Sequence, residues 1–111
     1  MRIVFLLAVV SSVALVGCGP TCQSTCNRLY QEPCNIQSPA GQKEELIRTC
    51  MDECESALKI PGEVGNYTPN EYTPASEPVT LENDHQAAVW MDCVAETSCE
   101  FLDGGYCAPV W

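Results

Sequence analysis

The sequence predicts an all-α fold, a small disulfide-stapled three-helix domain that contains an antiparallel helical hairpin. Three observations lead to this expectation. The chain has nine cysteines among 111 residues, a density typical of disulfide scaffolds. Two C-x3-C pairs place sulfurs at helical spacing, and apolar residues recur at the 3.6-residue period of an α-helix. A chain of this length is expected to form one small domain.

The N-terminal residues have the pattern of an export signal. Met1-Arg2 carries one positive charge, and residues 3–16 are apolar except for Ser11 and Ser12. A helix of that length would span about 21 Å, which is short of the roughly 30 Å hydrocarbon core of a bilayer. We therefore expect residues 1–17 to be a signal peptide and not a membrane span.

The segment Leu15-Val16-Gly17-Cys18 resembles the lipobox of bacterial lipoproteins. The resemblance implies that Cys18 is lipidated and becomes the first residue of a mature domain, 18–111. Gly19 follows in place of the aspartate that retains such lipoproteins in the inner membrane, so the resemblance favours the outer membrane. An ordinary signal peptide cut after Gly19 is the alternative. Lipid on Cys18 would leave eight cysteines, an even number that can form four disulfides. Without the lipid, nine cysteines would remain and one of them would lack a disulfide partner.

The first helix is expected from Pro20-Thr21 to about Gln31, before Pro33. One face of this helix collects Cys22, Cys26, Leu29 and Tyr30. The second helix is expected to start with Ser38 as N-cap and Pro39 at its first position, and to stop at Pro61-Gly62. Its apolar stripe comprises Leu46, Ile47, Cys50, Met51, Cys54, Ala57 and Leu58.

Residues 60–80 show no helical periodicity and contain four prolines, so we expect a loop. The third helix is expected from about Leu81 to Leu102, ending at Gly104-Gly105. Its apolar face would carry Trp90, Phe101, Val94, Ala87, Met91, Leu102, Ala95 and Ala88. Its opposite, solvent face would carry His85, Asp92, Glu96 and Glu100.

The two C-x3-C motifs predict the pairing of the hairpin. An i,i+4 pair places both sulfurs on one helix face. Antiparallel packing then joins Cys22 to Cys54 and Cys26 to Cys50, whereas the opposite pairing would need parallel helices. This twin motif resembles the plant α-hairpinin peptides and the small Tim chaperones of mitochondria, a likeness of geometry and not of function.

Four cysteines remain after the hairpin is paired. Cys93 and Cys99 are about 9 Å apart along one helix, too far to bond to each other. We expect Cys34–Cys93 with Cys99–Cys107, and Cys34–Cys99 with Cys93–Cys107 is almost as good. Metal binding is the competing interpretation, but we expect no metal because no C-x2-C knuckle is present and the chain has one histidine.

No motif for catalysis is present, and we expect no enzyme activity and no cofactor apart from the covalent lipid. His85 is expected to be exposed near the start of the third helix. A net charge of −10 excludes the basic surface of a nucleic-acid binder. Removal of residues 1–17 takes away Arg2 and brings the charge to −11, which favours a basic protein or a cationic ligand as partner.

Taken whole, the chain resembles the small cysteine-rich lipoproteins predicted in Gram-negative bacteria, and this resemblance implies export and anchoring but no activity. Our first hypothesis is therefore a lipid-anchored binding or structural module in the periplasm or at the cell surface. Candidate contact residues are the acidic stripe Asp92, Glu96 and Glu100 and the loop tyrosines Tyr67 and Tyr72. The alternative is a disulfide-stapled inhibitor or toxin-like effector that acts through the Tyr-Thr-Pro loop.

Overall fold

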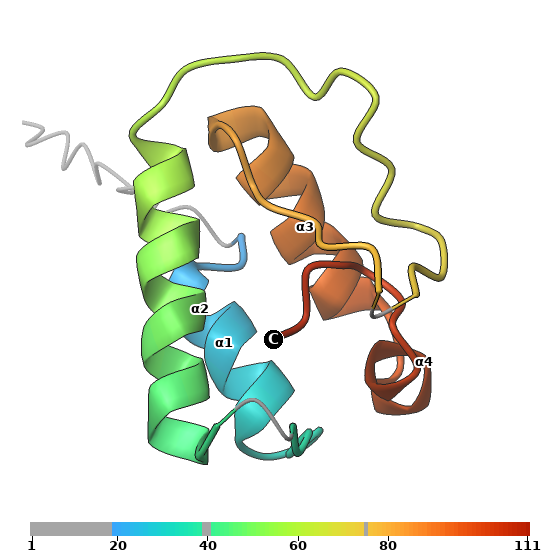
Figure 1. The fold of residues 1–111 in the computed structure, drawn as a ribbon. Helices are drawn as coiled ribbons and strands as arrows, with labels where there is room; N and C mark the ends of the chain where they lie inside the picture. The colour runs from blue at the N-terminus through green and yellow to red at the C-terminus, as the bar shows by residue number, and fades with distance from the viewer. Residues whose placement is uncertain (1–18, 39–40, 75) are drawn as a thin grey trace, which may run out of the picture.

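A computed structural model of the chain describes residues 19–38, 41–74 and 76–111 (Figure 1). They form four helices: α1 (Cys22–Tyr30), α2 (Lys43–Leu58), α3 (Asp84–Glu96) and α4 (Cys99–Asp103). No strand occurs among these residues, so the all-α prediction is confirmed. None of these helices is long and apolar enough to cross a membrane. The predicted signal peptide 1–17 and the predicted lipidation site Cys18 lie outside the described residues.

The first three helices pack against one another in all three pairings. Figure 1 shows α1 and α2 side by side, with α3 facing them and the long loop between α2 and α3 passing around the outside. The chain then turns through α4 and returns, so that its C-terminal end lies between the hairpin and α3. The core is therefore shared by the hairpin, α3 and this returning segment.

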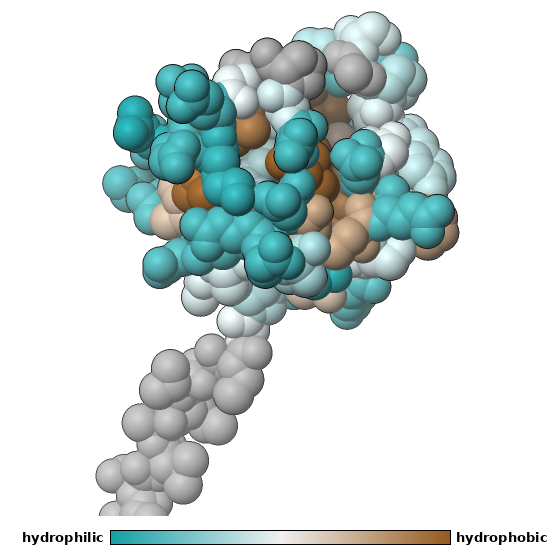
Figure 2. Space-filling view, turned by 90° about the horizontal axis from the view of Figure 1, so that it is seen from below, coloured by the Kyte–Doolittle hydropathy of each residue, from teal (hydrophilic) through white to brown (hydrophobic). Residues whose placement is uncertain are grey.

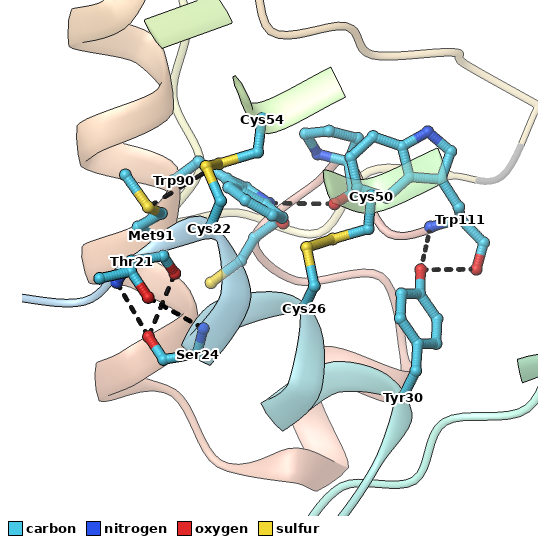
Figure 3. The surroundings of a disulfide bond; sticks show 12 residues. Thr21, Cys22, Ser24, Cys26, Tyr30, Cys50, Cys54, Trp90, Met91 and Trp111 are labelled. Carbon is cyan, nitrogen blue, oxygen red and sulfur yellow. Dashed lines mark hydrogen bonds between the residues drawn. A yellow bond between two sulfur atoms is a disulfide. The ribbon is translucent and has the colours of Figure 1, made fainter. Parts of the chain in front are cut away.

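Two disulfides cross-link the hairpin, as the spacing of the cysteines predicted (Figure 3). Cys22 is bonded to Cys54 with their Cα atoms 5.8 Å apart, and Cys26 is bonded to Cys50 with their Cα atoms 5.9 Å apart. All four residues are buried. The two helices of the antiparallel hairpin are therefore cross-linked by two disulfides one helical turn apart.

Helix α1 begins where the sequence predicted. The Thr21 hydroxyl accepts a hydrogen bond from the Ser24 amide at 3.0 Å, and the Ser24 hydroxyl accepts one from the Thr21 amide at 2.8 Å. This reciprocal capping box satisfies two backbone amides that a helix start otherwise leaves without partners.

Helix α2 begins at Lys43, so the predicted start at Ser38-Pro39 is wrong. Gln42 is the N-cap, in an extended conformation and without a side-chain capping bond. The physical reason is Gly41, which is a poor helix former and separates Ser38 from the continuous run of helix formers after Gln42. Pro39 itself lies outside the described residues.

The predicted third helix is two helices, because the chain breaks at Thr97. Thr97 has φ −101° and ψ 140°, an extended conformation that ends α3. Arg28 of α1 stabilises this end: its Nε donates to the Val94 carbonyl at 3.0 Å and its Nη2 to the Thr97 carbonyl at 2.8 Å. Ser98 then occupies the N-cap position of α4.

This break changes the pairing of the last four cysteines. The predicted Cys34–Cys93 and Cys99–Cys107 bonds are wrong, and the alternative pairing is the one formed. Because α4 turns away from the axis of α3, Cys99 meets Cys34 after α1, with 4.9 Å between their Cα atoms. Cys93 stays on the buried face of α3 and bonds to Cys107 of the C-terminal segment.

The core is centred on Trp90, which is completely buried. Its indole Nε1 donates to the Cys107 carbonyl at 3.1 Å and to the Pro109 carbonyl at 3.0 Å. Its ring meets that of Trp111 edge to face, with 5.9 Å between the ring centroids. The Tyr30 hydroxyl, also buried, donates to the Trp111 carbonyl at 2.9 Å (Figure 3). The C-terminal segment is thus a structural part of the core.

Several residues placed on apolar faces by the helical period are exposed. Leu58 lies at the C-terminal end of α2, where no helix covers it. Ala88 and Ala95 lie at the edges of the buried face of α3. Phe101 is exposed because the break at Thr97 rotates α4 relative to α3. The predicted apolar face of 81–102 therefore applies only to the part within α3.

Candidate binding surface

The loop between α2 and α3 is fixed to the start of α3 by four hydrogen bonds. The Asp84 amide donates to the Ile60 carbonyl at 2.8 Å, and the Gly62 amide donates to the Asp84 carboxylate at 3.2 Å. Asn83 and Gln86 donate through their side-chain amides to the carbonyls of residues 63 and 64, at 2.8 and 3.1 Å. The loop therefore leaves α2 along a defined path.

Tyr67 connects the middle of this loop to the C-terminal segment. Its hydroxyl donates to the Ala108 carbonyl, and the Cys107 amide donates to the Pro69 carbonyl at 3.0 Å. Burial raises the pKa of the Tyr67 hydroxyl far above its ordinary value. Tyr67 is thus a partly buried structural contact and not the fully exposed side chain that was predicted.

A groove of about 570 Å³ lies along the loop, between its first and last residues. Four glutamates line it, namely Glu63, Glu71, Glu77 and Glu82. One of them, Glu71, accepts a hydrogen bond from the Thr68 hydroxyl at 2.9 Å. The groove offers carboxylate and other oxygen atoms and no cationic side chain, which suits a cationic ligand.

The second predicted loop tyrosine, Tyr72, is exposed and lies against α4. Its ring makes edge contacts with Phe101, with 6.2 Å between the centroids, and with Tyr106, with 5.2 Å between the centroids. The ring centroids of Phe101 and Tyr106 are 6.3 Å apart. We call Tyr72, Phe101 and Tyr106 the aromatic patch.

The predicted acidic stripe is divided between two helices. Asp92 and Glu96 lie one turn apart on the exposed face of α3, whereas Glu100 lies beyond the break, on α4. The structure thus separates Glu100 from the stripe and places it next to Phe101 of the aromatic patch.

Charge is distributed unevenly along the chain. Residues 60–111 contain nine carboxylates and no lysine or arginine. The cations of the described residues are Arg28, which binds carbonyls of α3, and Lys43, Arg48 and Lys59, which belong to α2 or its C-cap. Within the described residues the single ion pair joins Asp84 to His85. The acidic surface formed by residues 60–111 is therefore not neutralised from within the domain.

His85 is exposed, as expected, with 62% of its side-chain surface accessible. Its Nδ1 lies 3.0 Å from the Asp84 carboxylate, whose hydrogen bond and charge raise the pKa of His85. Desolvation opposes ionisation of Asp84, but hydrogen bonds from His85 and the Gly62 amide lower the pKa of Asp84 overall. The pair lies on the surface, because the Asp84 side chain is 37% accessible and that of His85 is 62% accessible.

All eight cysteines from Cys22 onward are bonded to one another. No group of three or more His, Cys, Asp and Glu residues in the described parts of the chain is arranged to hold a metal ion. The ninth cysteine of the sequence, Cys18, lies outside the described residues.

Sequence reasoning missed two members of the aromatic patch, Phe101 and Tyr106. Phe101 was assigned to the apolar face of one long helix. The signal that could have corrected this assignment is Thr97-Ser98, because serine is a favoured N-cap residue. Tyr106 carried no pattern that distinguishes it from a core residue.

No known protein family, curated protein or solved structure matches this chain.

Proposed function

We propose that this protein is a lipid-anchored binding module, exported and held at the outer membrane through Cys18, with a basic protein or another cationic ligand as its partner. The observation that carries the proposal is the set of four disulfides, which pairs all eight cysteines from Cys22 onward with one another. The ninth cysteine of the sequence, Cys18, ends the lipobox-like segment Leu15-Val16-Gly17-Cys18. Two or more acyl chains there would provide stable anchoring, at about 0.8 kcal/mol per buried methylene.

The electrostatics of the domain support a cationic partner. Eight of the nine acidic residues in 60–111 are exposed, and the ninth, Asp84, is half-buried and paired with His85. That part of the chain contains no lysine or arginine. Such a surface repels the anionic headgroups of a membrane and attracts basic proteins, mainly by raising the rate of association. The proposal is a binding module and not an enzyme, because the only histidine is exposed and paired with its neighbour Asp84.

The inhibitor hypothesis predicts an exposed, rigid Tyr-Thr-Pro loop. Tyr67 instead points toward the C-terminal segment, where its hydroxyl binds the Ala108 carbonyl. We therefore base the proposal on the acidic surface and not on this loop as an inhibitory arm.

Intact-mass spectrometry and detergent-phase partitioning of the full chain, expressed with its own leader, test the anchor. We expect wild type to begin at Cys18 with a diacylglyceryl and an acyl adduct, to enter the detergent phase, and to contain no thiol that alkylates. Cys18→Ser should remain in the aqueous phase, and Gly19→Ser, which keeps Cys18, should behave as wild type. Wild-type protein that is water-soluble and alkylates at Cys18 would contradict the proposal.

The membrane assignment and the partner class have separate tests. Gly19→Asp should move the protein from the outer-membrane to the inner-membrane fraction of a density gradient. For the partner, cross-linking in intact envelopes should capture mainly basic proteins, and the capture should be lost near 1 M salt, where the Debye length is about 3 Å. Capture that is independent of the salt concentration and of the charge of the captured proteins would contradict a basic partner.

A further inference from the structure

The aromatic patch is exposed apolar surface that the fold holds in place. Tyr72 is 56% exposed and Phe101 is 50% exposed, although each ring contacts two others. The patch joins two segments that are distant in sequence, the loop between α2 and α3 and the region of α4 (Figure 1). Figure 2, which views the molecule from below, shows strongly hydrophilic side chains over much of that face with smaller apolar areas between them.

Backbone contacts position these rings independently of any ligand. Tyr72 and Tyr106 form an antiparallel β-bridge, and the Thr73 amide donates to the Gly105 carbonyl at 3.1 Å. Gly105 has φ +101°, and a Cβ there would lie 2.8 Å from the Thr73 carbonyl oxygen, so this close approach requires glycine. The bond between Cys34 and Cys99 fixes the start of α4. The patch is therefore preorganised, which lowers the entropy cost of binding.

Three exposed carboxylates neighbour the patch residues along the chain, and we call them the acidic rim. Glu71 precedes Tyr72, Glu100 precedes Phe101, and Asp103 follows on the last turn of α4; all three carboxylates are exposed. No lysine or arginine occurs in residues 60–111 to neutralise them. Aromatic faces attract cations through their quadrupole, and carboxylates beside them add charge attraction.

We propose that the aromatic patch binds arginine side chains of a basic protein partner. A guanidinium stacks flat on an aromatic ring and still donates to a neighbouring carboxylate, whereas an ammonium is a compact, strongly hydrated point charge. Glu71 also lines the acidic groove, so a segment with several arginines can contact both features. This inference rests on the proposed function, because it identifies where and how the cationic partner is held.

The test is a titration of the full chain, purified in a nonionic detergent, with fluorescent oligoarginine and with oligolysine of the same length. We expect wild type to bind oligoarginine more tightly than oligolysine. Phe101→Leu and Tyr72→Leu keep an apolar side chain but remove the ring, and each should weaken oligoarginine binding about two- to five-fold. Thermal melts of both variants identify any loss that comes from misfolding.

Two charge-matched double variants separate the patch from general acidity. Glu100→Gln with Asp103→Asn removes two carboxylates at the rim, and Asp52→Asn with Glu55→Gln removes two from α2. The rim variant should weaken oligoarginine binding more than the α2 variant.

Equal losses in the two double variants, with no effect of Phe101→Leu and Tyr72→Leu, would overturn the patch and leave diffuse acidic attraction. That result would leave the basic partner of the proposed function standing. Absence of oligoarginine binding to wild type even at low salt would overturn the patch and the basic partner together. In either case the test of lipid on Cys18 stands on its own.

Discussion

Replacement of Arg28 by methionine is expected to destabilise the domain, because this one side chain binds the C-terminal end of α3. Its guanidinium donates to the carbonyls of Val94 at 3.0 Å and Thr97 at 2.8 Å, from a partly buried position. Methionine keeps the apolar stem that packs between the helices but removes both donors and the charge.

The size of the expected stability loss follows from the two hydrogen bonds, the charge at the helix end and the partial exposure of Arg28. A hydrogen bond to a charged group contributes about 1.5–3 kcal/mol net, and two such bonds are lost. A cation at a helix C-terminus adds about 0.3–1 kcal/mol. Because Arg28 is only partly buried, water can take over part of the hydrogen bonding that the guanidinium provides. We therefore expect the free energy of unfolding to fall by about 2–4 kcal/mol.

Urea unfolding followed by circular dichroism, with all disulfides oxidised, measures this change. Arg48→Met, which removes the same charge from the exposed face of α2, is the control and should stay within about 0.5 kcal/mol of wild type. The stability of Arg28→Lys should lie between those of Arg28→Met and wild type, because an ammonium keeps the charge but lacks the planar fork of donors that reaches two carbonyls. Equal stability of Arg28→Met and Arg48→Met would refute this account of how α3 ends.

Three further predictions concern other parts of the fold. Mild reduction followed by alkylation and mass mapping should open Cys34–Cys99 first, because these two cysteines are partly exposed and the other six are buried; earlier opening of a hairpin bond would contradict this. The pKa of His85, measured by NMR, should lie above its ordinary value and fall in Asp84→Asn. Because the folded-state pKa is raised, the pair stabilises the fold below the unfolded pKa of about 6.5, and this contribution disappears as pH rises through the folded pKa; a His85 pKa that Asp84→Asn leaves unchanged would be inconsistent with the pairing. Tyr67→Phe should reduce the free energy of unfolding by about 0.5–1.5 kcal/mol, because the hydrogen bond to the partly buried Ala108 carbonyl is lost. The same substitution should remove one late-ionising tyrosine from an alkaline spectrophotometric titration, since burial raises the pKa of Tyr67; unchanged stability and an unchanged titration curve would place the Tyr67 hydroxyl in solvent.

The parts of the fold that local spacing determines could be predicted from the sequence. The i,i+4 spacing of Cys22 with Cys26 and of Cys50 with Cys54 leaves one pairing for an antiparallel hairpin, and that pairing is formed. The start of α1 was also predictable, because Thr21 and Ser24 satisfy each other's backbone amides within one turn.

The parts that depend on contacts between distant residues could not be predicted. Arg28 lies 66 residues before Val94, so no local pattern shows that it ends α3. Once that end was missed, the direction of α4, the partner of Cys99 and the exposure of Phe101 were misjudged together. The partly buried position of Tyr67 likewise depends on Ala108, a neighbour only in the folded chain.

The bond between Cys34 and Cys99 has a consequence for proteolysis. Every cysteine of the hairpin precedes residue 55, and the last three cysteines follow residue 92. Within the part of the chain that the structure describes, Cys34–Cys99 is therefore the only covalent link, apart from the backbone, between the two halves of the domain. A protease that nicks the chain anywhere in the intervening loop leaves both fragments tethered, and their separation then requires a thiol reductant.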